Sequence, residues 1–337
     1  MKMATPWTNA QLYPTHGFFF SNKALILNME NVKGISVTLL SPMANHTANG
    51  GEKLLGNASS IKRRPDGRVY ISGQMQRHAL FRAIERINLE DSERGTTYVS
   101  NGDGTTNQIE NDLRADMGGF MHPSQGSYSG RRTAPVSATF AVATEESDVG
   151  RDLLIRIKQN TNTESEQKQA LATNEFSQED DMQMSFHLDV SALSVSKAFT
   201  YEEERHVATN YVKHVPEAER MRRAKLFLEA TRFLNDYANQ ARNATTGEPQ
   251  KALIVLDSRL SRKASRFFDM SDAERENLLN ELEARGATYF LGDDTTTDGY
   301  SVFEAYAAAR DALESLFDPT GGAEPVPFDT FADQAEA

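Results

Sequence analysis

An α+β fold on the ferredoxin-like, or split βαβ, plan is predicted by the order in which apolar patterns follow one another. Alternating apolar and polar residues indicate strands, and apolar residues three or four positions apart indicate helices. The patterns follow each other as strand, helix, strand, strand, helix, strand, with polar stretches inserted between them. With 337 residues and 39% apolar content, the chain can bury one sizeable core. We therefore expect one domain over residues 1–317 and an acidic, disordered tail over residues 318–337.

The first half of the chain supplies one long strand, one short strand and one helix. Residues 34–40 alternate in polarity and predict the first strand. Residues 68–71 predict a short strand, and the apolar spacing over residues 74–89 predicts the helix that follows it. Two stretches near residues 44–60 and 91–132 are rich in Gly, Asn, Asp and Ser, so we expect them to be insertions into the core fold.

The middle of the chain predicts two core strands, at residues 136–143 and 182–190, which we expect to lie side by side. The residues between them are mostly polar and could not fill a core. A projecting β-hairpin near residues 155–181 fits this composition better than a compact subdomain.

The last third predicts alternating helices and strands. A helix is expected to begin at Pro216, and residues 252–256 form an unbroken apolar run typical of a buried strand. Two S-x-x-E capping boxes, starting at Ser271 and Ser301, predict the first turns of two further helices. A short strand is predicted between them at residues 288–291.

Composition excludes several kinds of chemistry. The chain has no cysteine, so it cannot form disulfides, zinc–thiolate sites or a thiol nucleophile. Its first residues lack an apolar core followed by a cleavage site, and no run of about 18 apolar residues occurs. We therefore expect a cytoplasmic protein with no membrane partner.

Charge is unevenly distributed along the chain. The net charge of −12 argues against a nucleic-acid partner, but the acids concentrate in residues 145–181 and in the tail. Residues 53–86 carry eight Lys and Arg side chains against two acids. Within them, three successive cations precede a Pro-Asp-Gly turn, a strand and a helix start. Cations and the free N–H groups of a helix N-terminus would then converge, which predicts a phosphate-binding surface.

The candidate phosphate-binding residues are the cations and amides of this segment, together with one later arginine pair that should end near it. They are Lys53, Lys62, Arg63, Arg64, Arg68, Gln74, Gln76, Arg77, His78, Arg131 and Arg132. Arg82 and Arg86 lie further along the helix and are expected to be an ordinary solvated face.

Other motifs do not predict a site. The glycines before Lys53 lack the spacing of a phosphate-binding loop. Residues 293–304 depart from a calcium loop at several ligand positions, so helix capping explains them better. His206 and His214 match no metal motif and are expected at the surface, and no G-x-S-x-G setting occurs. We expect no catalytic residue, metal or cofactor.

Four segments in order resemble a known family. It is the Cas-seven family of repeat-associated RNA-binding proteins, the backbone subunits of Cascade-like CRISPR effector complexes. The segments are the first strand with Ser41, Pro42 and His46 after it, Val69–His78, Met117–Met121 with Arg131–Val136, and Met184–Val190. The resemblance covers about residues 33–257. It implies a modified RRM palm with inserted fingers, and a thumb hairpin at residues 155–181.

The resemblance also implies partners. Copies of the chain would stack along a CRISPR guide RNA (crRNA) and grip its backbone, leaving the bases free to pair with target DNA. Each thumb would reach the neighbouring copy, and other effector subunits would complete the ribonucleoprotein.

Two alternatives remain at this point. Some relatives cut target RNA with a loop aspartate, and this sequence has Arg64 at or near that position, which implies a non-cleaving subunit. The first alternative is therefore an RNA-cleaving subunit that uses Asp66 in the turn and a divalent metal. The second alternative is an α+β metabolite-binding protein that happens to carry a basic loop.

Overall fold

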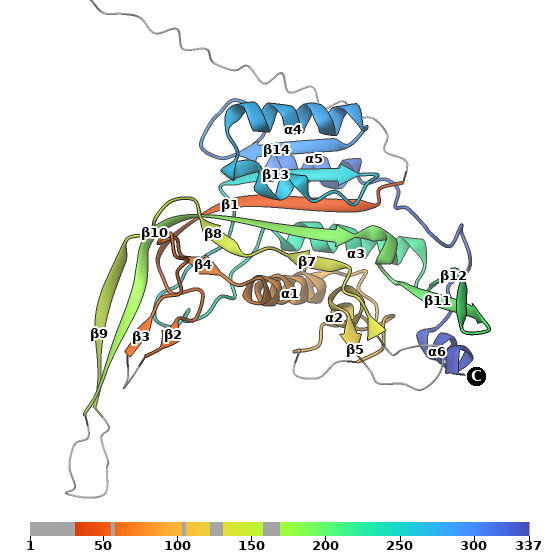
Figure 1. Ribbon diagram of the computed structural model, residues 1–337, viewed down its shortest axis with the longest axis horizontal. Coiled ribbons are helices and arrows are strands. Elements are labelled where there is room, and N and C mark those ends of the chain that lie inside the picture. The colour runs from red at the N-terminus through yellow and green to blue at the C-terminus, as the bar shows by residue number, and fades with distance from the viewer. Residues whose placement is uncertain (1–30, 55–57, 103–105, 122–130, 158–168, 337) are drawn as a thin grey trace, which may run out of the picture.

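The computed structural model describes residues 31–54, 58–102, 106–121, 131–157 and 169–336 (Figure 1). Its centre is a ten-stranded sheet within these ranges. The main strands of this sheet are β1 (Gly34–His46), β10 (Gln169–Asp189), β13 (Lys251–Asp257) and β14 (Thr288–Asp293), and β14 lies at the edge beside β13. Strand β1 lies between β10 and β13 and is antiparallel to both. The mixture of sheet and helices confirms the predicted α+β class.

The strand order also gives the split arrangement. The single strand predicted at residues 136–143 is divided into β7 (Val136–Ala138) and β8 (Ala141–Ala143), and both pair antiparallel with β10. Therefore β1 runs parallel to β7 and β8 with β10 between them, and β10 runs parallel to β13 with β1 between them. Each βαβ unit is split by a strand of the other unit.

One face of the sheet carries the main core. Helices α1 (Gly73–Glu90), α3 (Glu217–Ala230) and α5 (Val302–Ala312) pack on it. Because side chains alternate along a strand, Ile35, Val37 and Leu39 of β1 all point to this face and contact the helices. Helix α3 begins after Pro216 as predicted and ends at Ala230.

The opposite face is covered on one half. The 3-10 helix η2 (Lys263–Asp269) and α4 (Asp272–Ala284) pack on β13 and β14 through a second apolar cluster that contains Leu253, Phe267 and Leu282. Both predicted capping boxes, at Ser271 and Ser301, are present. On this face β10 presents Gln183, Ser185 and His187. Ser185 and His187 are buried at 4% and 5% exposure where η2 packs against the strand, whereas Gln183 is partly exposed on the open half.

Two hairpins extend from opposite ends of the body (Figure 1). The first pairs β9 (Val149–Ile157) with the first half of β10, from Val149↔Ser177 to Ile157↔Gln169. A projecting hairpin is predicted near residues 155–181; its paired arms lie at 149–157 and 169–177, and β10 continues from it into the central sheet. The second hairpin, which the sequence analysis missed, pairs β11 (Val195–Glu202) with β12 (Arg205–Lys213).

The turn of the second hairpin explains why it was missed. Glu203 and Glu204 have positive φ angles of 48° and 68°, positions that Asn and Gly usually occupy in hairpin turns. Its base also corrects an expectation, because His214 is buried at 3% exposure rather than at the surface. His214 Nδ1 bonds the Val326 carbonyl at 2.8 Å, and His206 is exposed as expected.

The C-terminal stretch differs from the disordered tail that its composition predicts. Helix α6 (Phe328–Glu336) packs on the body through Phe328 and Phe331, which are 1% and 4% exposed. They contact a small cluster with Phe120 and Ile109, and Lys213 bonds Asp318 at 2.8 Å. Two aromatic residues three positions apart form one apolar helix face, which outweighs the acidic composition around them.

Short elements occupy the two predicted insertions and the connections. The first insertion contains β2 (Glu52–Lys53) and β3 (Ala58–Ser60), and β3 pairs with the outer half of β10. The remaining elements are β4 (Tyr70–Ile71), α2 (Leu113–Gly118), β5 (Phe120–Met121), β6 (Arg131–Arg132) and η1 (Val190–Ala192). None of the helices in the described ranges combines the length and apolar character that a membrane crossing requires.

Candidate nucleic-acid interface

The basic run lies on a tight turn that backbone bonds hold in place. Arg64 N–H donates to the Arg68 carbonyl at 2.9 Å, and Gly67 N–H donates to the Arg64 carbonyl at 3.0 Å. Gly67 has a φ of +82°, which a residue with a Cβ rarely adopts. The Asn49 side-chain amide clamps both arms by donating to the carbonyls of Lys62 and Tyr70 at 3.0 Å each. The turn therefore presents its side chains from a fixed backbone.

Three cations of this turn have no acidic partner in the described part of the chain. Lys62, Arg63 and Arg64 form no salt bridge there, although Arg68 is paired. Arg68 Nε donates to Asp66 Oδ2 at 2.8 Å, and this hydrogen bond holds the pKa of the exposed Asp66 carboxyl below its usual range. The basic turn, as we call Lys62–Arg68, thus keeps its first three charges available to an anion.

The start of α1 lies directly after the basic turn. Ser72 caps the helix, with its Oγ accepting from Met75 N–H at 3.3 Å. A Cβ on Gly73 would lie 3.0 Å from the Ala138 carbonyl, so a larger residue would be crowded where β4 turns into the helix. Gln74 and His78 are exposed and, being four residues apart, share one face of α1. These two polar side chains therefore face solvent on the helix that follows the basic turn.

The structure buries two of the candidate residues and part of a third. Gln76 is completely buried and accepts a hydrogen bond from the Tyr237 hydroxyl at 3.1 Å. Arg77 is partly buried, which lowers its pKa, and it donates to the Gly118 carbonyl at 2.8 Å. Arg132 is 8% exposed and bonds Asp116. These are corrections to the predicted set, because side chains that hold helices and loops together are not available to a phosphate.

The other candidates stand apart from the basic turn. Lys53 is exposed on β2, beside the β9–β10 hairpin. Arg131 pairs with Met121 through the backbone of β6, next to α2. Arg82 and Arg86, expected as a solvated face, are partly exposed and bond Glu85 and Asp236. The basic turn and the exposed side chains of α1 therefore stay a predicted surface, and the remaining candidates do not belong to it.

A buried ion network lies in the interior next to α2 and β6, and no motif in the sequence indicated it. The Asp116 carboxylate is fully buried and receives hydrogen bonds from Arg132, from Arg223 at 2.7 Å and from the Ser194 hydroxyl at 2.7 Å. Burial alone raises the pKa of Asp116, but the two arginines outweigh it and hold the pKa below its usual range. The network joins α2, β6, α3 and the start of β11. No local pattern could reveal it, because an arginine on an amphipathic helix normally indicates a solvated face.

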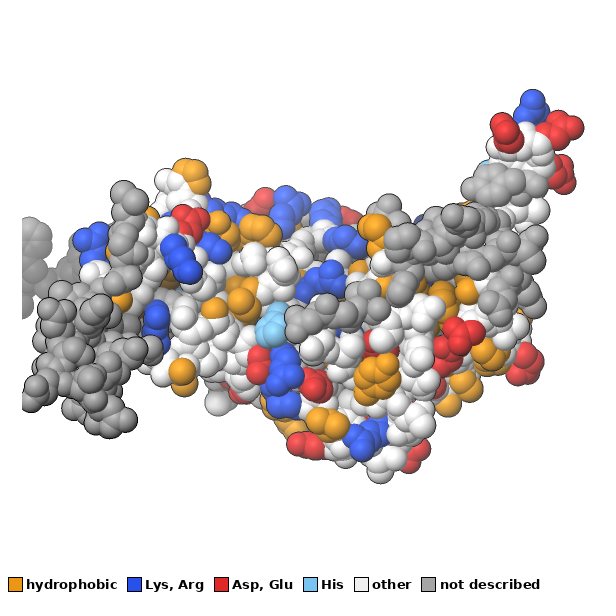
Figure 2. All heavy atoms as spheres, turned by 90° about the horizontal axis from the view of Figure 1, so that it is seen from below, with side chains coloured by type: hydrophobic (Ala, Val, Ile, Leu, Met, Phe, Trp, Pro, Cys, Tyr) orange, Lys and Arg blue, Asp and Glu red, His pale blue; other side chains and the backbone are white. Residues whose placement is uncertain are grey.

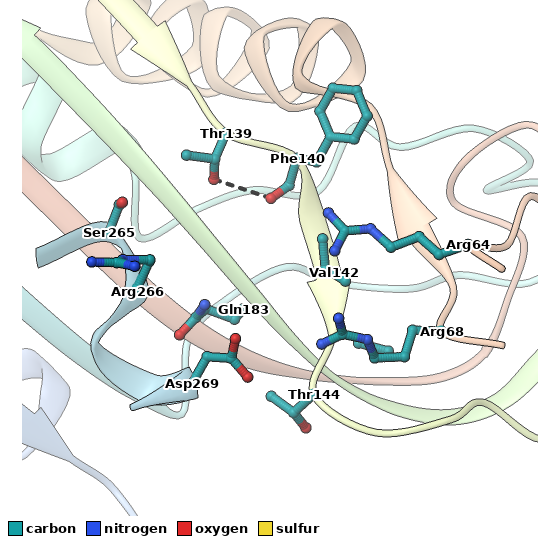
Figure 3. Close-up of a pocket in the computed structure, with 11 residues that line it drawn as sticks. Arg64, Arg68, Thr139, Phe140, Val142, Thr144, Gln183, Ser265, Arg266 and Asp269 are labelled. Atoms are coloured by element: carbon teal, nitrogen blue, oxygen red, sulfur yellow. Dashed lines mark hydrogen bonds between the residues drawn. The ribbon is translucent and has the colours of Figure 1, made fainter. Parts of the chain in front are cut away.

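A pocket of about 400 Å³ lies on the open half of the sheet (Figure 3). The basic turn supplies Arg64 and Arg68, η2 supplies Arg266 and Asp269, and β10 supplies Gln183. Sequence analysis did not connect these residues, since up to 205 positions separate the turn from η2. The pairing of β4 with β8 and of β8 with β10 places the basic turn at one wall, and the packing of η2 on β1 and β10 places the other.

Figure 2 shows the face that carries α1 and α2. Lys and Arg side chains form a broken band over its left and centre, interrupted by acids, whereas the tip of the β11–β12 hairpin at the upper right is mainly acidic. That tip consists of Glu202, Glu203, Glu204 and Arg205. The positive charge is therefore local, as the sequence predicts, on a protein that is acidic overall.

Comparisons with known proteins bear on the family to which the chain belongs. No curated protein matches the sequence. Two solved chains, from structures titled "CRISPR RNA-guided surveillance complex" and "CRISPR RNA-guided surveillance complex, pre-nicking", each superpose with a TM-score of 0.48. They are 14% and 12% identical to this chain and cover 90% of it, with 99% and 100% of their own lengths covered. A family model described as "CRISPR-associated negative auto-regulator DevR/Csa2" matches residues 46–250, which is more than half of the sequence. The chain therefore belongs to this CRISPR-associated DevR/Csa2 family.

Proposed function

We propose that the protein is a non-catalytic backbone subunit that binds the guide RNA of a multi-subunit CRISPR complex. The observation that carries the proposal is the basic turn, whose Lys62, Arg63 and Arg64 form no salt bridge in the described chain and shortly precede the start of α1. Membership of a CRISPR-associated family supports the choice of RNA as the polyanion. A metabolite-binding protein with an accidental basic loop would not be expected to share this family.

The chemistry of the surface suits a subunit that must accept any guide sequence. Lysine and arginine contact phosphates without reading bases, and Gln74 and His78 add hydrogen bonds to phosphate or sugar. Free N–H groups in the first turn of α1 favour an anion at the same place. Bases left free in this way can pair with target DNA.

Copies of the chain would meet along the guide. We propose that the β9–β10 hairpin is the thumb that reaches the neighbouring copy and that the single domain of residues 1–317 is the repeating unit. Leu153 and Ile155 on β9 are 63% and 57% exposed, and large exposed apolar side chains on a projecting arm are typical of a contact surface. Other subunits of the complex would bind the ends of this assembly.

Copurification tests the proposal directly. When the protein is expressed together with a CRISPR array transcript, it is expected to elute from a sizing column as an assembly of several copies with RNA of discrete length. Cooperative binding along a strand is typical of proteins that hold a backbone without reading sequence. A monomer that carries no RNA, even at low salt, contradicts the proposal.

Cleavage distinguishes the non-catalytic subunit from its alternative. The Asp66 carboxylate is already bonded by the backbone N–H and the guanidinium of Arg68, at 3.2 and 2.8 Å. Wild-type protein with Mg²⁺ is expected to leave a complementary RNA intact, and Asp66→Ala is expected to bind the guide at least as tightly because one acid leaves the basic turn. If the wild type cuts the RNA at regular spacing and Asp66→Ala does not, Asp66 is catalytic and our proposal fails.

A further inference from the structure

The pocket on the open half of the sheet has the form of a ligand site that the guide surface does not explain. Its floor is formed by Gln183 of β10 and Val142 of β8, which are partners in the sheet. The basic turn forms one wall, and η2 forms the other (Figure 3). Its volume of about 400 Å³ falls in the range of small-molecule sites.

Cations dominate its walls. Arg64 and Arg68 extend from the basic turn towards η2, which contributes Arg266 (Figure 3). The lining contains one carboxylate, that of Asp269. Arg64 and Arg266 form no salt bridge or side-chain hydrogen bond with the residues that the structure describes. Guanidinium groups on facing walls repel one another unless an anion lies between them, and phosphate is the anion that arginine binds with two parallel hydrogen bonds.

The floor of the pocket contains a hydrogen-bond acceptor, to which a phosphate cannot donate. Gln183 Oε1 is buried and has no hydrogen-bond partner. A buried acceptor without a donor is unfavourable, and Gln183 lines the pocket, so a ligand that donates a hydrogen bond to this oxygen would be favoured there. The nearby Thr139 hydroxyl is engaged with the Phe140 carbonyl at 3.0 Å. A phosphodiester has no proton to donate at neutral pH, whereas the 2′-hydroxyl of ribose has one.

The rim offers a place for a base. Phe140 is 50% exposed and stacks on Tyr70, with ring centroids 5.6 Å apart and an interplanar angle of 12°. Stacking on an aromatic ring accepts any base. We propose that the pocket binds one ribose–phosphate unit of single-stranded RNA. The phosphate lies between Arg64 and Arg266, which have no ion-pair partner in the described chain, and the 2′-hydroxyl donates to Gln183. The inference rests on the proposed guide binding and adds to it a means of distinguishing RNA from DNA.

Three oligonucleotides of one sequence test this inference: RNA, DNA, and 2′-fluoro RNA. The last keeps the ribose pucker and has no 2′ proton to donate. Binding to wild type, Arg266→Ala and Gln183→Leu is measured by fluorescence anisotropy over a range of salt concentrations. Arg262→Ala is the matched control, because Arg262 is exposed just before η2 and does not line the pocket.

Wild type is expected to bind RNA about fivefold more tightly than the other two strands, the worth of one hydrogen bond. Gln183→Leu is expected to remove this preference. Arg266→Ala is expected to weaken all three strands and to reduce the salt slope by about 0.7, while Arg262→Ala changes neither quantity. Melting curves check that the variants remain folded.

The failures are distinguishable. If wild type binds RNA but Arg266→Ala behaves like Arg262→Ala, or Gln183→Leu keeps the preference for RNA, the pocket inference is wrong and guide binding stands. If wild type binds none of the three strands at low salt, both the proposed guide binding and the pocket inference are wrong.

Discussion

Replacing Lys62, Arg63 and Arg64 together with alanine is expected to weaken guide binding by about 10- to 100-fold at physiological salt. Each phosphate contact to a single strand releases about 0.7 of a counterion, so the slope of log affinity against log salt is expected to fall by about two. The three side chains form no salt bridge within the described chain, so their loss should leave the fold intact. Fluorescence anisotropy with a labelled guide, measured at several salt concentrations, gives both quantities.

The control for this variant must remove the same charge elsewhere. Arg259, Arg262 and Arg310 are exposed and form no salt bridge with the described residues, so their triple alanine variant has the same net charge. It is expected to keep nearly the full salt slope, because charges away from the contact act only through the long-range field. Equal losses in the two variants would mean that overall charge governs binding and that the basic turn has no special role.

Asp116→Ala is expected to lower the free energy of unfolding by about 3–5 kcal/mol, the usual cost of removing one partner from a buried ion pair. Arg132 and Arg223 would remain buried at 8% and 0% exposure without their shared carboxylate. The Ser194 hydroxyl would also lose its acceptor. Denaturant unfolding followed by circular dichroism measures the change.

An exposed ion pair gives the comparison for Asp116. The Asp272 side chain is 89% exposed and lies 3.4 Å from Arg275. Asp272→Ala is expected to cost no more than about 1 kcal/mol, since water already solvates both charges. If Asp116→Ala is no worse than Asp272→Ala, the buried network does not hold α2, β6 and α3 together as we argue.

The network also affects the guide surface indirectly. Arg77 of α1 donates to the Gly118 carbonyl at the end of α2, and Asp116 lies in the same short helix. Loss of the Asp116 contacts would therefore loosen α2, which contacts α1 through Arg77. Gln74 and His78 stand on that helix, so RNA binding should fall together with stability in Asp116→Ala and remain in Asp272→Ala.

Local sequence determined much of the fold. Strand β1, helix α1 and both capping boxes depend on contacts within a few residues, so periodicity and capping residues predict them. The β11–β12 hairpin was missed because its turn uses glutamates in a left-handed conformation. Helix α6 was missed because Pro, Gly and acids surround its two buried phenylalanines.

For the site, the sequence by itself determined the basic turn and its place before a helix, because the turn glycine, the clustered cations and the capping serine are all neighbours in the chain. Only the tertiary structure decided which polar residues face water. Gln76 and Arg132 have the chemistry of phosphate ligands but meet Tyr237 and Asp116 in the interior. No local sequence pattern marks Arg266 or Gln183. Gln183 comes close to Arg64 through strand pairing, and Arg266 through the packing of η2 on the sheet. Burial is set by contacts between residues far apart in the chain, and no local pattern records those contacts.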